Sequence, residues 1–174
     1  MLKFIVLAVV VLFAIVLVYA ATRPDTIQVE RSVDIKAAPE KIFPFINDFR
    51  QWNEWTPYNK DPAMKKTYSG SASGKGAMYA WDGNKDVGKG EIAITGSEQN
   101  SRIALELHMI EPFEGRNSVM FTLSKAGDST RVTWSLVGKQ NFMSKFMGLI
   151  FNMDRMIGGD FEAGLAKLKA VAER

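Results

Sequence analysis

The chain has no cysteine and a single histidine among its 174 residues. The lack of cysteine excludes disulfides, thiolate metal sites and a cysteine nucleophile. One histidine, His108, excludes every site that needs two, and we predict neither a metal ion nor a cofactor. An excess of one charge is also missing, because 22 basic and 19 acidic residues leave a net charge of +3. A nucleic-acid binder needs a patch or stripe of excess charge, so no nucleic-acid partner is predicted.

An uncharged run at the N-terminus is the strongest signal in the sequence. Residues 4–21 contain no charged side chain, with Lys3 before them and Arg23 after them. A helix of this length, at about 1.5 Å per residue, matches the hydrocarbon core of a bilayer. We therefore predict a transmembrane segment at residues 1–22, which contacts the membrane through residues 4–21, and a short tether at residues 23–26.

Two interpretations of this segment stay open. Val18-Tyr19-Ala20 resembles the small-x-small site of a cleaved secretory signal, but the apolar run is longer than the usual signal core of about 7–15 residues. Both interpretations export the rest of the chain, because folded domains are translocated largely regardless of nearby charges. We expect a single-pass membrane protein whose globular domain, residues 27–174, is extracytoplasmic, either periplasmic or at the cell surface.

The first part of the domain is predicted to be a strand followed by two short helices. Residues 27–35 alternate apolar and polar side chains, as a strand with one buried face does. Pro39 is suited to start a helix, because its missing N–H costs nothing there. Trp52 and Trp55 follow at three-residue spacing, which predicts a second short helical segment.

In the rest of the domain, the spacing of apolar residues changes from every second position to every third or fourth position. Over residues 64–137, apolar residues such as Met78 and Ala80 recur at alternate positions between turns, which predicts an antiparallel meander. Residues 141–173 have apolar residues every three or four positions, and we expect a kink or two abutting helices at Gly158-Gly159. A long amphipathic helix must bury its stripe on the sheet. The predicted fold class is therefore α+β, with a curved antiparallel sheet wrapped around a long C-terminal helix.

The polar residues of the domain offer few candidates for chemistry. Arg31 shares a strand face with apolar residues, and three roles are open for it: a structural ion pair, a group that holds the polar head of a ligand, or a strand end in solvent. His108 points away from the apolar face of its strand, and Glu111 and Glu114 lie at a predicted strand end. We interpret these three as surface residues rather than as an acid–base system.

Several segments in combination resemble one known superfamily. They are residues 31–43, 52–57, 81–83, 88–91, 112–113, 130–134 and 161–165. Together they are similar to the START-like helix-grip superfamily (SRPBCC), in the branch usually labelled polyketide cyclase/dehydrase. The resemblance implies a helix-grip fold with a cavity between the sheet and the long C-terminal helix that takes apolar ligands. It does not imply cyclase activity, because one fold hosts many functions.

The function expected from this resemblance is a membrane-anchored binding or carrier domain for a hydrophobic small molecule or lipid. An enzyme of the polyketide cyclase or dehydratase type is one alternative, and a non-catalytic interaction module with no open cavity is another; no catalytic residue is named. Methionines and phenylalanines crowd residues 142–157, so we expect that stretch to form a movable wall of the cavity. The candidate ligand-binding residues are Arg31, Trp55, Trp81, Leu105, Leu107, Phe121, Trp134, Phe146, Ile150, Met153 and Ile157.

Overall fold

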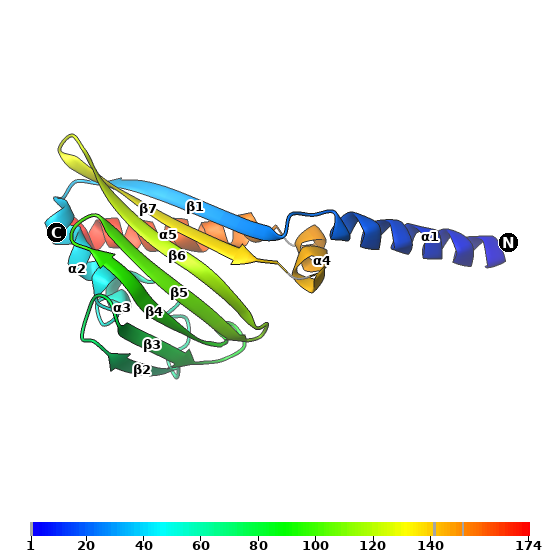
Figure 1. Cartoon of the computed structure of the whole chain (residues 1–174), viewed down its shortest axis with the longest axis horizontal. Helices are drawn as coiled ribbons and strands as arrows, with labels where there is room; N and C mark the ends of the chain where they lie inside the picture. Colours follow the sequence, from blue (N-terminus) through cyan, green and yellow to red (C-terminus); the bar gives the residue numbers. More distant parts are fainter. Residues whose placement is uncertain (1, 141, 151) are drawn as a thin grey trace.

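The computed structural model describes residues 2–140, 142–150 and 152–174, without the side chains of residues 2, 8, 143, 147 and 150. A long N-terminal helix projects from a domain of strands and shorter helices (Figure 1). The elements in chain order are α1 (Leu2–Ala21), β1 (Thr26–Ile35), α2 (Pro39–Asn47), α3 (Trp52–Trp55), β2 (Lys65–Gly70), β3 (Ala77–Asp82), β4 (Lys89–Glu98), β5 (Arg102–Glu111), β6 (Gly115–Ala126), β7 (Ser129–Lys139), α4 (Phe142–Ile150) and α5 (Met153–Ala172).

One curved sheet of seven strands forms the body of the domain, in the order β1-β7-β6-β5-β4-β3-β2. Strands β2 to β7 follow one another as antiparallel neighbours, and β1 completes the sheet by pairing with β7. In that pairing Arg31 lies opposite Trp134, and Val29 opposite Leu136. The sheet curves around α5, as Figure 1 shows, which confirms the predicted α+β fold.

The inner face of β3 is occupied by other residues than the sequence suggested. Tyr79 pairs with Ile92 of β4, and these residues share the inner face with Trp81. Met78 and Ala80, the expected alternating pair, are on the outer face, and Met78 is exposed. Every residue in the middle of β3 is apolar or aromatic, so a period of two cannot assign the face from sequence.

The C-terminal helical stretch is divided earlier than expected. α4 ends at Ile150 and α5 begins at Met153, after Asn152, whose Oδ1 accepts a hydrogen bond from the Arg155 N–H at 2.9 Å. A bond of this kind is typical of a helix N-cap. α5 continues without a break through Gly158-Gly159, so the joint expected at that pair is wrong. The two helices have different neighbours, because α5 packs on β1 whereas α4 packs on α1.

The guanidinium of Arg31 joins α5 to β1. Its Nε donates to Glu162 Oε1 at 2.7 Å, and its Nη2 donates to Asp154 Oδ2 at 3.0 Å. Arg31 therefore forms a structural ion pair, which was one of the three roles left open for it. Its side chain is half-buried, with 26% exposed. A Cβ atom at residue 158 would lie 2.1 Å from Nη2 of Arg31, so Gly158 lets the guanidinium lie against the helix.

We expect Gly158→Ala and Gly159→Ala to have different effects on stability. Alanine in place of a helical glycine normally raises the free energy of unfolding by about 0.5–1 kcal/mol. Gly159→Ala should show this gain, because nothing lies within 4 Å of the added methyl group. Gly158→Ala should lose it, because the methyl group displaces the Arg31 guanidinium from its partners. Urea unfolding of the full chain in detergent measures both effects.

The matching control combines Gly158→Ala with Arg31→Ala. Without the guanidinium, the methyl group at residue 158 has room. The double variant should therefore have a free energy of unfolding about 0.5–1 kcal/mol above that of Arg31→Ala alone. Equal effects of the two alanine variants in the wild-type background would contradict the close contact between Arg31 and α5.

Candidate functional site

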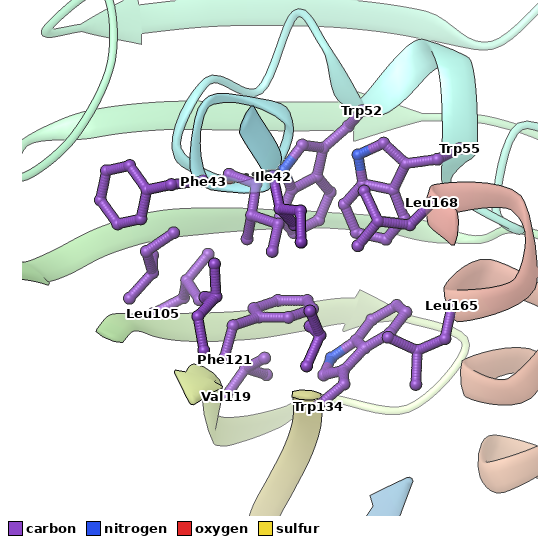
Figure 2. Packing of buried hydrophobic residues seen from close by; sticks show 14 of the residues in the cluster. Ile42, Phe43, Trp52, Trp55, Leu105, Val119, Phe121, Trp134, Leu165 and Leu168 are labelled. Carbon is purple, nitrogen blue, oxygen red and sulfur yellow. Dashed lines mark hydrogen bonds between the residues drawn. The ribbon is translucent and has the colours of Figure 1, made fainter. Parts of the chain in front are cut away.

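The middle of the domain, between the sheet and α5, is filled by aromatic side chains. Trp134 of β7 stacks on Phe161 of α5, with ring centroids 4.0 Å apart and planes at 9°. Trp55 of α3 meets Trp134 at 5.6 Å and Phe121 of β6 at 6.0 Å, edge to face in both cases. Figure 2 shows Trp55, Phe121 and Trp134 converging from the helices and the sheet. Their exposures of 0%, 0% and 3% show a packed aromatic cluster.

The backbone of α2 holds the indole groups of both α3 tryptophans, Trp52 and Trp55, in place. Trp52 Nε1 donates to Ile46 O, and Trp55 Nε1 donates to Phe45 O, both at 2.8 Å. A buried indole N–H usually needs such a partner, so these bonds fix the orientation of both rings. The backbone of α2 therefore positions the tryptophans of α3 against the sheet.

The indole N–H of Trp134 is different. Within the described part of the chain, its Nε1 is the one fully buried side-chain polar atom without a hydrogen-bond partner. The ring is confined by α5, because a Cβ atom at Gly164 would lie 2.9 Å from Trp134 Cζ3. A buried donor without an acceptor costs about 1–3 kcal/mol. An oxygen atom of a ligand would remove that cost, which makes this N–H a candidate polar contact.

A row of aromatic side chains continues along the inner face to the edge of the sheet. Tyr68 of β2 stacks on Tyr79 of β3 at 5.3 Å, and Tyr79 stacks on Trp81 at 5.8 Å. These rings are half-buried, as is Leu107 of β5. Burial raises the pKa of Tyr79 to about 12. We call Tyr68, Tyr79, Trp81 and Leu107 the open inner face, because these apolar and aromatic side chains stay partly exposed.

The loop at residues 56–64 connects α3 to β2 and is tied to both α5 and the sheet. Lys60 Nζ pairs with Asp160 Oδ1 of α5 at 3.1 Å. Asp61 Oδ2 accepts a hydrogen bond from the Asn84 N–H in the turn between β3 and β4 at 2.8 Å. The loop is also held by apolar contacts, because Pro57 and Met64 are buried and the ring of Tyr58 meets that of Trp134 at 6.4 Å.

Two hollows of the described surface lie away from the aromatic cluster. One lies beside α2 and is lined in part by Glu40, Phe43 and Asn47. The other lies along α1, between Lys3 and Val10. Both are open depressions, and neither is the expected cavity between sheet and C-terminal helix, where aromatic rings occupy the space.

The structure divides the predicted ligand-binding residues into several groups. Trp55, Leu105, Phe121 and Trp134 are in the packed core, Trp81, Leu107, Met153 and Ile157 are half-buried, Arg31 is half-buried and paired, Phe146 is on α4, and the side chain of Ile150 lies outside the described residues. Phe146 lies on α4, which packs against α1. Residues 142–157 are therefore divided between two helices rather than forming one wall. The role of all these residues in binding stays a prediction.

The candidate acids and bases lie on the outer face of the sheet. His108 is flanked by two carboxylates, with Nδ1 3.2 Å from Glu91 Oε1 and Nε2 3.3 Å from Glu114 Oε1. The imidazole is therefore half-buried by its neighbours rather than fully solvent-facing, whereas Glu111 is exposed. Across the described residues, no group of three or more His, Asp or Glu side chains is arranged to hold a metal ion.

Comparison with protein families finds a match to the whole domain. The family model described as "Polyketide cyclase / dehydrase and lipid transport" matches residues 26–173. The matched range begins at the first residue of β1 and includes all of α5, but it does not include α1. No curated protein sequence matches the chain.

Solved structures share the fold at low sequence identity. A protein from Chromobacterium violaceum matches with a TM-score of 0.61 and 15% identity, over 87% of this chain and 99% of that chain. A protein from Mesorhizobium loti matches with a TM-score of 0.57 and 20% identity, over 86% of this chain and 97% of that chain. The di-domain ARO/CYC BexL from the BE-7585A biosynthetic pathway matches with 0.64 and 14%, over 90% of this chain and 53% of that chain. At such identities the likeness shows the fold alone.

We expect Tyr79 to titrate well above an ordinary tyrosine. Burial raises its pKa to about 12 from a usual value of 10.0. Because the folded-state pKa lies above the unfolded one, the stabilisation is complete below pH 10 and is lost as the pH rises toward 12. Tyr79→Phe should reduce this loss in unfolding experiments, and ultraviolet absorbance of tyrosinate follows the titration directly.

Tyr19→Phe is the control for this pH dependence, because Tyr19 lies in α1, outside the domain. It should leave the alkaline loss of domain stability unchanged. The same pH profile for wild type and Tyr79→Phe would show that the ring of Tyr79 is not buried in the folded protein.

Proposed function

This chain belongs to the polyketide cyclase / dehydrase and lipid transport family, and we propose that it binds a hydrophobic small molecule or lipid on the inner face of its sheet. The observation that carries the proposal is the open inner face, where four apolar or aromatic side chains remain half-buried beside a packed cluster. Covering such side chains with a ligand gains about 25 cal/mol per Å² of apolar area before the costs of binding.

We assign the indole N–H of Trp134 as the contact for the polar part of the ligand. Small-molecule sites combine apolar walls with a few polar groups that fix orientation. The unpartnered Nε1–H of Trp134 is a donor, so the ligand that fits is an apolar molecule with an acceptor oxygen. To reach this donor, a ligand has to displace neighbouring side chains or the loop at residues 56–64. The Lys60–Asp160 pair that ties this loop is partly exposed, and exposed ion pairs contribute little to stability.

The two alternatives have less support from the geometry. An enzyme needs acids or bases that face its substrate. His108, Glu91 and Glu114 are on the opposite side of the sheet from the aromatic cluster, which favours binding over catalysis. An interaction module without a cavity agrees with the packed centre, but it leaves the half-buried aromatic row and the unpartnered indole N–H without a role.

We further propose that α1 stays attached as a membrane anchor, with the domain on the extracytoplasmic side. Lys3–Ala21 is long and apolar enough to cross a membrane, and nearly all of it is exposed. Arg23 lies over the ring of Tyr19 at 5.6 Å, and a basic and an aromatic residue together suit a membrane interface. A cleaved secretory signal is the alternative.

Leu107→Trp should weaken ligand binding without a large loss of stability. The indole would occupy the open inner face, whereas a large side chain forced into a packed core costs about 1–3 kcal/mol. We expect about tenfold weaker binding of a fluorescent fatty-acid analogue, or about 1.4 kcal/mol. Native mass spectrometry of the full chain in detergent should show a co-purified lipid on wild type and less of it on the variant.

Val137→Trp is the matched control, because Val137 is exposed on the outer face of β7. It should bind the probe as wild type does. A wild-type protein that binds no apolar probe, together with strong destabilisation by Leu107→Trp, would replace the carrier proposal with the module that has no cavity.

The mass of the protein isolated from membranes should include the residues from Met1 onward, because the apolar run exceeds the usual length of a signal core. The protein should also stay with the membrane during an alkaline carbonate wash, as a spanning helix does. A soluble product that begins at Ala21 would identify a cleaved signal instead.

A further inference from the structure

One end of the domain lies beside the proposed anchor. β1 runs away from α1, so in an antiparallel sheet β5 and β7 end, and β6 begins, at the end of the sheet from which α1 extends (Figure 1). This end therefore holds α4, which follows β7, together with the start of α5 and the turn at residues 112–114 between β5 and β6. We call it the anchor end.

α4 is fastened to the base of α1. The two helices are in contact, and Lys145 of α4 is buried in an ion pair with Asp25, just after α1. The hydrogen bond and the charge of Lys145 lower the pKa of the Asp25 carboxyl. The Gln140 N–H also donates to Asp25 O at 2.8 Å. Lys145 is the sole charged residue in the sequence of α4, so the helix has no unpaired charge to keep it in water.

Large apolar side chains at the anchor end are exposed. Phe113 in the β5–β6 turn is 68% exposed, Met156 in the first turn of α5 is 56% exposed, and Phe142 at the start of α4 is 48% exposed. Exposed apolar side chains gathered at one end of a domain mark a surface that meets a partner. Aromatic residues and amphipathic helices are favoured at the boundary between lipid headgroups and acyl chains.

We infer that the anchor end rests on the membrane that α1 spans, with α4 in the interfacial layer and Phe113 inserted beside it. The inference depends on the proposed anchor. The tether favours lipid over a protein partner, because residues 22–25 span at most about 14 Å at about 3.3–3.6 Å per residue. An apolar helix held so close to a bilayer meets lipid first.

This placement also means that the membrane can supply the ligand of the proposed site. Leu107 of the open inner face lies on β5, which ends at the turn that carries Phe113. The open inner face thus extends toward the lipid surface. An apolar ligand passes between bilayer and domain there without crossing water, so the ligand class that fits is a membrane lipid or a molecule dissolved in the membrane.

Labelling at single cysteines tests the contact, because the chain has no cysteine of its own. The full chain is reconstituted into phosphatidylcholine vesicles with an environment-sensitive fluorophore at Phe113→Cys or Phe142→Cys. Asp128→Cys, in the exposed turn between β6 and β7 at the far end, is the matched control. Val11→Cys, in the middle of α1, reports on the anchor itself. Quenching by nitroxide-labelled lipid and by aqueous iodide is measured for each.

Labels at residues 113 and 142 should be quenched by the nitroxide lipid, about as strongly as an interfacial probe, and protected from iodide, whereas the label at 128 should show the reverse. Lipid quenching at residue 11 with none at 113 and 142 would overturn the membrane contact and leave the anchor intact. Protection from both quenchers at 113 and 142 would indicate contact between copies of the chain and would also overturn it. A label at residue 11 that lipid does not quench would overturn the anchor together with this inference.

Discussion

The close approach of α5 to β1 and β7 determines how the domain is built. Two glycines of α5 make it possible, since a Cβ atom at Gly158 would meet Arg31 and one at Gly164 would meet the ring of Trp134. With no side chain in between, Trp134 and Phe161 stack at 4.0 Å, and Arg31 reaches carboxylates on α5. β1 must then lie next to β7, because the inner faces of both strands meet the same helix.

Patterning in the sequence was enough to predict the elements and the fold class, because each element has a side that must be buried. The alternation over residues 27–35 and 64–137 predicts strands, Pro39 marks the start of α2, and the three-residue spacing of Trp52 and Trp55 marks α3. The N-terminal helix was equally evident, since an uncharged run of this length is typical of a membrane span or a signal sequence. These signals are local, and the structure has a strand or helix at each of these places.

What the sequence could not predict depends on contacts between distant residues. The alternation in the sequence places Met78 rather than Tyr79 on the inner face of β3. The pairing of β3 with β4 decides which of these two residues faces inward, and the sequence does not show that pairing. Gly158-Gly159 suggested a joint, yet the glycine at 158 makes room for Arg31, and the helix begins instead at the cap formed by Asn152. The partners of Arg31 lie more than a hundred residues away along the chain, and no periodicity identifies them.

The packed aromatic cluster changes where function is sought. Because Trp55, Phe121 and Trp134 fill the middle of the domain, a ligand has either to displace them or to use the open inner face. Binding on the open inner face costs less free energy than displacing the cluster. The rings of β2 and β3 are already partly exposed, whereas a closely packed core resists expansion. Trp134 belongs to the packed cluster, so its N–H, which lacks an acceptor, is reached only by displacing core side chains. A domain built in this way keeps its stability in the packed cluster and leaves the open inner face available to a ligand.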